Sequence, residues 1–199
     1  MNIGVLASHN GTNLQAMIDA HDNGKLDAKI AVVISNNSKS GALERARKHR
    51  IKYYHLSNKT HPDINSLDEA ICNALEEAAV DIVFLAGYMK KLGRLTLTRF
   101  KGKILNTHPA LLPKFGGKGM FGINVHKAVI KSGEKESGVS IHIVDTEYDT
   151  GSVIRQCKVK VYNQDTPELL CERVLKCERK FIVETLQKIA TNELELYKV

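Results

Sequence analysis

The chain opens with MNIGVLASHNGTNLQAMI (residues 1–18), and this stretch decides the fold class. The mostly apolar residues 3–7 predict a buried strand, and the polar turn at residues 8–13 then leads into a helix that we expect to begin near Thr12 or Asn13. A strand, a tight glycine-containing turn and a helix make the first half of a β-α-β unit. We therefore predict an α/β fold.

The same alternation of apolar runs and helix-period segments continues over the first two thirds of the chain, which predicts a largely parallel sheet. Further strands are expected at residues 30–35, 53–56, 82–86 and 104–106, and helices at residues 41–49, 66–78 and 124–131. In the last third, two strand-like runs at 138–145 and 153–161 flank a turn and predict an antiparallel pair, so we expect a mixed sheet. Thr166 and Pro167 then begin a long terminal helix that ends near residue 189.

Length and composition limit the class of protein. With 199 residues, against roughly 150 per domain, the chain is expected to form a single domain. Its 43% hydrophobic and 26% charged residues are ordinary for globular proteins, and they exclude disorder, collagen and coiled coil as whole-chain structures. No run reaches the ~18 apolar residues of a membrane span, and the N-terminus does not read as a signal peptide. We therefore expect a cytoplasmic protein with no membrane partner.

The net charge and the cysteines narrow the chemistry. A formal charge of +7 favours an anionic partner, which could be a nucleic acid, an acidic membrane surface or a phosphorylated small molecule. With 6% aromatic residues and no nucleic-acid motif, nucleic-acid binding is the minority hypothesis. The four cysteines have neither zinc-site nor redox spacing, so we expect free core thiols and no metal; they are Cys72, Cys157, Cys171 and Cys177.

The turn SHNGTN (residues 8–13), between the first strand and the first helix, is a candidate anion site. Backbone N–H groups of a tight turn and of a helix N-terminus point the same way and carry partial positive charge, which suits a phosphate. The turn lacks the lysine of a P-loop and the three glycines of a dinucleotide fingerprint, which argues against nucleoside triphosphates and NAD. The alternative is an ordinary β-α turn in which Thr12 or Asn13 caps the helix, and spacing alone favours neither.

A formal G-x-G-x-x-G does occur, at residues 117–122. It follows a proline-containing loop rather than a strand, so the geometry that gives the motif its meaning is missing. We interpret this segment as a mobile, basic loop.

Asn106, Thr107, His108 and Pro109 stand where a buried strand is expected to end. In open α/β sheets, ligands bind in the crevice at the carboxyl ends of the strands. Asn106 and His108 are two positions apart, so their side chains point the same way from an extended chain. An asparagine can donate to a developing oxyanion, and a histidine can supply a proton or a positive charge. The alternative is that His108 is a surface residue or a hydrogen-bonded core residue.

More polar residues are candidates for the same cleft. Asp149 lies in an acidic turn, where a carboxylate near His108 would favour the imidazolium and orient the ring; the alternative is ordinary turn chemistry. Ser140 and His142 share one face of a half-buried strand, and they either line the cleft or form a hydrogen-bonded structural pair. Glu178 stands at the edge of the apolar stripe of the terminal helix, and its alternative is a solvated helix flank.

Taken together, these segments resemble the folate-dependent formyltransferases over nearly the whole chain. The strongest part of the resemblance is ILNTHPALLPK (residues 104–114), followed by GVSIHIVD (138–145) and DTG (149–151). The loop NGTNLQ (10–15) narrows it to the phosphoribosylglycinamide, or glycinamide ribonucleotide, formyltransferase family. The resemblance implies a Rossmann-like, open twisted mixed sheet with flanking helices and a long C-terminal helix.

The resemblance also implies an activity. The amine of glycinamide ribonucleotide would attack the formyl carbon of 10-formyltetrahydrofolate, a consumed co-substrate, and form a tetrahedral intermediate in de novo purine biosynthesis. Asn106 would hydrogen-bond the formyl oxygen, and a protonated His108 would stabilise the oxyanion. Asp149 would hold His108 charged and position a water. A cis bond between Leu112 and Pro113 is also implied.

Binding residues and partners follow from the same resemblance. One formyltransferase domain would cover residues 1–199, with a phosphate-substrate half at about 1–100 and a folate-binding, catalytic half at about 101–199. Contacts to glycinamide ribonucleotide would come from Gly11, Thr12, Asn13 and Glu178. Contacts to the folate would come from Met89, Lys90, Lys91, Leu92, Asn106, Asp145, Thr146, Glu147, Tyr148 and Asp149. The expected partners are these two small molecules, with no nucleic acid, in a monomer or homodimer.

Two other functions stay open at this point. A 10-formyltetrahydrofolate hydrolase would use the same residues with water in place of the amine. Such enzymes usually carry an extra N-terminal domain, which we do not expect here because the chain starts directly at the first strand. A non-catalytic module that binds a phosphate ligand would explain the basic charge and the Gly11 turn. It would leave the joint placement of Asn106, His108 and Asp149 unexplained.

Overall fold

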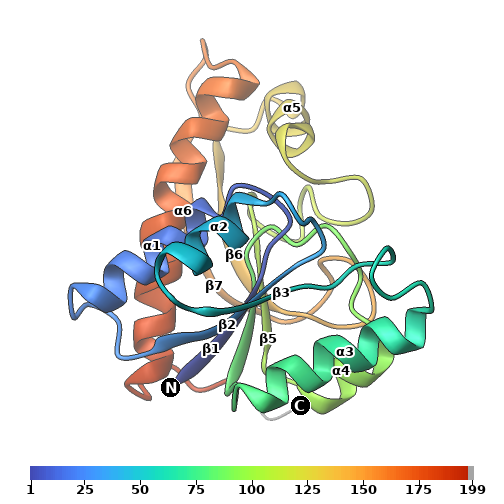
Figure 1. The fold of residues 1–199 in the computed structure, drawn as a ribbon. Coiled ribbons are helices and arrows are strands. Elements are labelled where there is room, and N and C mark those ends of the chain that lie inside the picture. Colours follow the sequence, from blue (N-terminus) through green and yellow to red (C-terminus); the bar gives the residue numbers. More distant parts are fainter. Residues whose placement is uncertain (197–199) are drawn as a thin grey trace.

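A computed structural model describes residues 1–196, so the last three residues of the expected domain lie outside the described part (Figure 1). The strands are β1 (Asn2–Leu6), β2 (Lys29–Ser35), β3 (Lys52–His55), β4 (Ile82–Leu85), β5 (Ile104–His108), β6 (Glu136–Ile143) and β7 (Val153–Lys160). The helices are α1 (Thr12–Asp22), α2 (Gly41–Lys48), α3 (Ile64–Glu77), α4 (Arg94–Arg99), α5 (Ile123–Ser132) and α6 (Pro167–Ala190).

The seven strands form one sheet in the order β3-β2-β1-β4-β5-β6-β7. The pairs among β1 to β5 are parallel, whereas β6 pairs antiparallel with β5 and β7 antiparallel with β6. The predicted mixed sheet is therefore confirmed. The direction of winding reverses between β1 and β4, and open α/β sheets bind ligands at such a reversal, outside the carboxyl ends of the strands.

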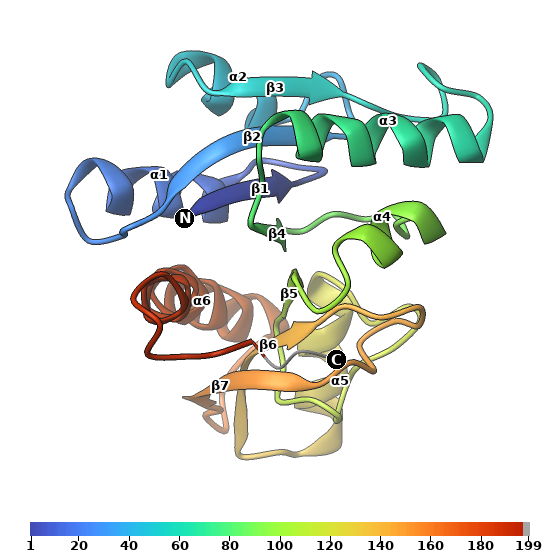
Figure 2. The ribbon, with the colours of Figure 1, turned by 90° about the horizontal axis from the view of Figure 1, so that it is seen from below.

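Helices cover both faces of the sheet, with α1 and α6 on one side and α3 and α4 on the other (Figure 2). Successive residues of a strand point to opposite faces. From β1, Ile3 and Val5 enter a cluster with α1, α2 and α6, and Leu6 enters a second cluster with α3. Apolar side chains thus fill both faces, and the ends of the strands carry the polar side chains described below.

Local signals start most helices where the sequence predicts them. Ser40, Asp63 and Thr166 each accept a hydrogen bond from a backbone N–H in the first turn of α2, α3 and α6. The short helix α4 was not predicted, because its cap comes from another helix. The carboxylate of Asp68 in α3 accepts from the backbone N–H of Leu95 at 2.7 Å, although the two residues are 27 positions apart.

Two strands differ from the prediction. β5 continues to His108, so this residue lies within the strand rather than in the loop. β6 is buried on both faces instead of being half-buried, since Ser140 is 0% and His142 is 2% exposed. Burial of these polar side chains is tolerated because each is hydrogen-bonded: Ser140 Oγ accepts from the N–H of Leu112 at 2.9 Å, and His142 makes the contacts described below.

The cysteines are only partly in the core. All four are free thiols; Cys72 is buried, and Cys157, Cys171 and Cys177 are half-buried. The predicted core position is therefore wrong for these three; Cys157 of β7 and Cys177 of α6 pack at the edge of the apolar cluster.

Candidate active site

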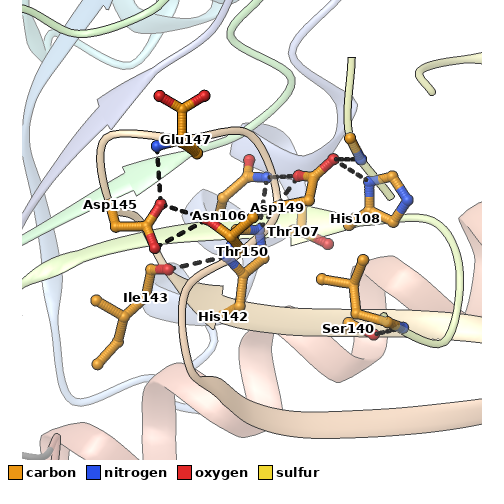
Figure 3. Close-up of polar contacts among 12 residues, drawn as sticks. Asn106, Thr107, His108, Ser140, His142, Ile143, Asp145, Glu147, Asp149 and Thr150 are labelled. Carbon is orange, nitrogen blue, oxygen red and sulfur yellow. Dashed lines mark hydrogen bonds and ion pairs between the residues drawn. The ribbon is translucent and has the colours of Figure 1, made fainter. Parts of the chain in front are cut away.

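Segments far apart in the sequence meet at the carboxyl end of β5 (Figure 3). Asn106 and His108 come from β5, His142 comes from β6, and Asp149 reaches them from the loop between β6 and β7. Asp149 Oδ2 lies 3.4 Å from His108 Nδ1. Asp149 Oδ1 lies 3.5 Å from Asn106 Nδ2 and also 3.5 Å from His142 Nε2. The structure therefore brings together the three residues to which the sequence gives catalytic roles.

The loop that carries Asp149 is held in an unusual conformation. Asp149 has a φ of 58°, a left-handed conformation that costs free energy for a residue other than glycine. Its Oδ2 accepts a hydrogen bond from the N–H of Gly117 at 2.9 Å. A Cβ at Gly151 would clash with the carbonyl oxygen of Ile143, so only glycine allows this close return of the loop to β6. The strained turn is what places the carboxylate beside His108.

His142 determines which way Asn106 faces. Its Nδ1 donates to the carbonyl oxygen of Ile143 at 2.9 Å. Its Nε2 lies 3.1 Å from Asn106 Nδ2. The amide nitrogen of Asn106, which is the group able to donate to an oxyanion, is thus turned toward Asp149.

Burial and charge oppose each other at His108, which is 3% exposed. Burial lowers the pKa of the ring, whereas the Asp149 carboxylate and the carbonyl of Phe115 raise it; burial has the larger effect, so the pKa lies below its ordinary value. The expectation that Asp149 holds His108 charged stays a prediction: the carboxylate raises the pKa of the ring, as that role requires, while desolvation lowers it. His108 Nε2 donates to the carbonyl of Phe115 at 2.7 Å, and Nδ1 faces the Asp149 carboxylate.

Burial and polar contacts also oppose each other at Asp149. Burial raises the pKa of its carboxyl, but the contacts with His142 and the N–H of Gly117, together with the charge of His108, lower the pKa by more. Its pKa is therefore below the ordinary value. A carboxylate held beside an imidazole is suited to moving a proton.

Ser140 and Gln156 support the loop that follows β5. Ser140 Oγ donates to the carbonyl of Ala110 at 2.6 Å. Gln156 Nε2 donates to Ser140 Oγ at 2.8 Å and to the carbonyl of Leu112 at 2.9 Å. Ser140 therefore holds the loop, and it does not form a structural pair with His142, whose partners are at the site itself.

The same loop, residues 109–122, is partly built into the site. The Leu112–Pro113 bond within it is cis, as the resemblance implies. The N–H of Gly117 contacts Asp149, so the formal glycine motif at 117–122 begins with a residue that helps to hold the aspartate. The motif follows this loop and not a strand, in agreement with its rejection as a dinucleotide fingerprint.

The turn at residues 8–13 has the helix start that an anion site requires. Gly11 stands immediately before α1 with a φ of 68°, and it provides no side-chain cap to the N–H groups of the first turn. The alternative in which Thr12 or Asn13 caps the helix is wrong, because α1 already begins at Thr12. A Cβ on Gly11 would lie 2.8 Å from Cα of Ala42, so the turn is packed closely against α2.

Glu178 of α6 is buried, at 5% exposed, and does not lie on a solvated flank. Its Oε1 accepts a hydrogen bond from Thr107 Oγ1 at 2.9 Å. Burial raises the pKa of Glu178, and the contacts of Asn13 and Thr107 lower it by less. Asn13 Oδ1 is buried without a hydrogen-bond partner among the described residues. The structure thus brings Asn13 and Glu178 together, as expected for residues of one binding site.

Apart from Asn106 in β5, the predicted folate-contacting residues lie on two loops that meet, one after β4 and one between β6 and β7. Lys91 Nζ donates to the carbonyl of Thr146 at 3.1 Å and lies 4.8 Å from the centre of the Tyr148 ring. The N–H of Met89 donates to Ser8 Oγ at 2.8 Å, next to the turn before α1. The other predicted contacts on these loops are Lys90, Leu92, Asp145 and Glu147.

Sequence reasoning did not single out Thr107, Phe115, Gly117 or Gln156. Phe115 and Gly117 contribute backbone groups, and Gln156 acts on another loop, so their side-chain types carried no signal. Thr107 did carry a signal in the sequence, because a strand residue between Asn106 and His108 must point to the opposite face of the sheet.

Comparison with known proteins matches residues 1–186 to the family model described as "Formyl transferase". The chain is 37% identical to the chloroplastic phosphoribosylglycinamide formyltransferase of Arabidopsis thaliana, over 97% of this chain and 66% of that protein. It is 42% identical to the phosphoribosylglycinamide formyltransferase of Haemophilus influenzae, over 83% of this chain and 76% of that protein. The crystal structure of glycinamide ribonucleotide transformylase 1 from Symbiobacterium toebii matches with a TM-score of 0.90 and 35% identity, over 100% of this chain and 91% of that one.

A formyltetrahydrofolate deformylase from Pseudomonas syringae shares the architecture with a TM-score of 0.86. It is 23% identical, and the match covers 99% of this chain and 63% of the deformylase. At that identity the likeness shows the fold alone, so it does not favour the hydrolase alternative.

Proposed function

The chain belongs to the formyl transferase family, and from this membership we propose that it transfers the formyl group of 10-formyltetrahydrofolate to the amine of glycinamide ribonucleotide, N1-(5-phospho-D-ribosyl)glycinamide, in de novo purine biosynthesis. Its similarity to named phosphoribosylglycinamide formyltransferases supports an enzyme of this kind. The observation that carries the assignment is the cluster of Asn106, His108 and Asp149 at the carboxyl end of β5. A binding module would not need these three side chains together.

The reaction requires a stabilised oxyanion and the movement of a proton. The amine nitrogen attacks the formyl carbon, the carbonyl electrons move to oxygen, and collapse of the tetrahedral intermediate breaks the bond to the folate nitrogen. One proton must leave the attacking nitrogen, and one must reach the leaving nitrogen. Asn106 Nδ2 donates to the oxyanion, a contribution of about 10²–10³ in rate for a well-placed donor.

His108 and Asp149 move the proton. Burial lowers the pKa of the His108 ring before reaction. A negative charge that forms beside the ring raises this pKa again, since it favours the imidazolium. His108 then takes the proton released by the attacking nitrogen, and the ionised Asp149 stabilises the positive charge and aligns a water that carries the proton onward.

The phosphate of glycinamide ribonucleotide binds the N–H groups of Gly11, Thr12 and Asn13 at the start of α1, and its ribose hydroxyls donate to Glu178. The buried, unpartnered Asn13 Oδ1 fits such a ligand, because a hydroxyl or N–H of the substrate would satisfy it. The folate lies along the loops that carry Met89 and Tyr148. Both binding regions therefore face the same edge of the sheet.

Other expectations stay predictions. Within residues 1–196, no helix is both long and apolar enough to cross a membrane, and no group of three or more His, Cys, Asp or Glu side chains is placed to hold a metal ion. A cytoplasmic location, a monomer or homodimer, and the lack of nucleic-acid, membrane and metal partners are proposed from the sequence. The same holds for the single domain with halves at about 1–100 and 101–199.

The test is the absorbance of the folate product after the protein is mixed with 10-formyltetrahydrofolate, with and without glycinamide ribonucleotide. We expect a signal that depends on the ribonucleotide. An equal signal without it would identify a hydrolase. No signal in either mixture would favour a binding module.

A further inference from the structure

Thr107 and Glu178 form a hydrogen bond between the strand that carries the candidate catalytic residues and the helix that faces the ribonucleotide. Thr107 lies between Asn106 and His108 in β5, so its side chain points to the opposite face of the sheet. On that face, Leu105 belongs to the apolar cluster that β5 shares with α6. Thr107 Oγ1 lies 2.9 Å from Glu178 Oε1 within this layer.

Because Thr107 and Glu178 are both buried, the hydrogen bond between them fixes the orientation of the Glu178 carboxylate. Thr107 is 9% and Glu178 is 5% exposed. A carboxylate can only accept, so the threonine hydroxyl must donate. A charged group buried among apolar side chains is costly unless hydrogen bonds compensate it. Among residues 1–196, the polar partners of Glu178 from other elements are Thr107 and Asn13, with Arg179 adjacent on its own helix.

The bond also leaves one side of the carboxylate for a ligand. Oε1 is used by Thr107, and Oε2 remains available to accept. Asn13 Oδ1, on the amide that contacts Glu178, is a second acceptor with no partner among the described residues. A ligand with two neighbouring hydroxyl donors, as in a ribose, would satisfy both acceptors.

We propose that Thr107 is a positioning residue for the ribonucleotide, because its hydroxyl holds the Glu178 carboxylate in the orientation that accepts from the ribose hydroxyls. This inference rests on the proposed function, since it takes Glu178 as a ribose contact. If Thr107 has this role, β5 orients both the candidate catalytic residues and the residue that contacts the ribonucleotide. Asn106 and His108 face the reacting atoms from one side of β5, and Thr107 supports the substrate anchor from the other.

The test compares Thr107→Val with Thr107→Ser in the full chain. Valine keeps the shape of threonine without the hydroxyl, whereas serine keeps the hydroxyl. We expect Thr107→Val to raise both the KM and the calorimetric Kd for glycinamide ribonucleotide roughly tenfold, the loss typical of one hydrogen bond to a charged group. The kcat and the KM for the folate should change less than about twofold, because Asn106, His108 and Asp149 are untouched. Thr107→Ser should restore most of the affinity.

Thr185→Val is the matched control. Thr185 is fully buried on α6, and its hydroxyl donates to the carbonyl of Phe181 at 2.7 Å and accepts from Arg155 at 3.0 Å. This variant also loses a buried hydroxyl, in this case one on α6 for which no contact with Glu178 is found among the described residues. Its affinity for the ribonucleotide should be unchanged, and thermal unfolding of all three variants reports on folding.

Two results would overturn the inference. One is an unchanged Kd for the ribonucleotide in folded Thr107→Val, and the other is a fall in kcat with the KM preserved. Failure of the proposed function is distinguishable, because the unmodified protein would then bind ribonucleotide without forming product, or would not bind it. In the first case the Kd comparison still decides the role of Thr107. In the second case both proposals fail.

Discussion

The turn before α1 and the cluster at the end of β5 both lie at carboxyl ends of parallel strands, yet they are built in different ways. The turn presents backbone N–H groups from one continuous stretch around Gly11, with no side-chain cap. The cluster presents side chains from β5, β6 and the loop between β6 and β7. Anion binding is thus a local property of the chain, whereas the catalytic arrangement exists only when distant segments fold together.

The two regions also differ in burial. Thr12 is exposed at the start of α1, whereas His108 is 3% exposed. Charges near the turn are therefore screened by water, while those in the cluster act in a medium of low dielectric constant. Substitutions at the turn should change the affinity for the ribonucleotide, and substitutions in the cluster should change turnover.

The largest expected effect is that of Asp149→Asn in the cluster. Loss of the carboxylate removes the charge that stabilises a protonated His108, and kcat should fall about a thousandfold or more. Asparagine tolerates the left-handed conformation at φ 58°, so the fold should be kept. Single-turnover kinetics and thermal unfolding measure the two quantities. A kcat within tenfold of the unmodified protein would contradict a catalytic role for Asp149.

The next largest effect is expected for Thr12→Asp, a substitution at the turn before α1 and not in the cluster. An aspartate in the first turn of α1 complements the helix dipole and should leave stability unchanged or raise it by about 0.3–1 kcal/mol. It also places negative charge beside the bound phosphate, so the Kd for glycinamide ribonucleotide should rise about 10- to 100-fold. Folate binding should be preserved, and Thr12→Asn is the neutral control. Calorimetry that shows equal weakening of both ligands would refute this phosphate site.

The smallest effect concerns the pH dependence of stability. It tests whether burial lowers the pKa of a histidine near the cluster. His126 of α5 is 1% exposed, and its Nδ1 has no hydrogen-bond partner within residues 1–196. Burial, and then the charge of His108, lower its pKa below the ordinary value. The unfolded chain then binds a proton below about pH 6.5 that the folded chain does not. The free energy of unfolding should therefore fall as pH drops from 7.5 to 5.5, by at most about 1.4 kcal/mol per pH unit for each such proton.

His126→Gln isolates this contribution. Glu178 has a raised pKa and contributes with the opposite sign, so the difference between the variant and the unmodified protein is the informative quantity. Urea unfolding across the pH range should show a shallower slope for His126→Gln. Parallel slopes would mean that His126 titrates normally in the folded protein.

The fold was predictable where its signals are local. Alternating apolar runs predicted the strands, and Thr166 marked the start of the terminal helix, because caps and periodicity act within a few residues. The helix α4 escaped prediction because Asp68, which caps it, lies in another helix. β6 was predicted as half-buried because its pattern alternates, but its polar side chains have buried partners in distant segments.

The site was predictable in its membership and less so in its electrostatics. The two-residue spacing of Asn106 and His108 placed both on one side of β5, and the resemblance implied Asp149 as their partner. The lowered pKa of His108 could not be predicted from the sequence, because it depends on burial that the whole fold creates. The bond from Thr107 to Glu178 likewise exists only once α6 packs on β5.

The most direct test follows an isotopic label on the formyl carbon of 10-formyltetrahydrofolate in the presence of glycinamide ribonucleotide, with the unmodified protein and with His108→Ala. We expect the unmodified protein to place the label in the formyl amide of the ribonucleotide, and His108→Ala to slow this transfer by orders of magnitude while still binding both ligands. Label recovered as free formate, or transfer at an unchanged rate in His108→Ala, would contradict formyl transfer at the cluster on β5.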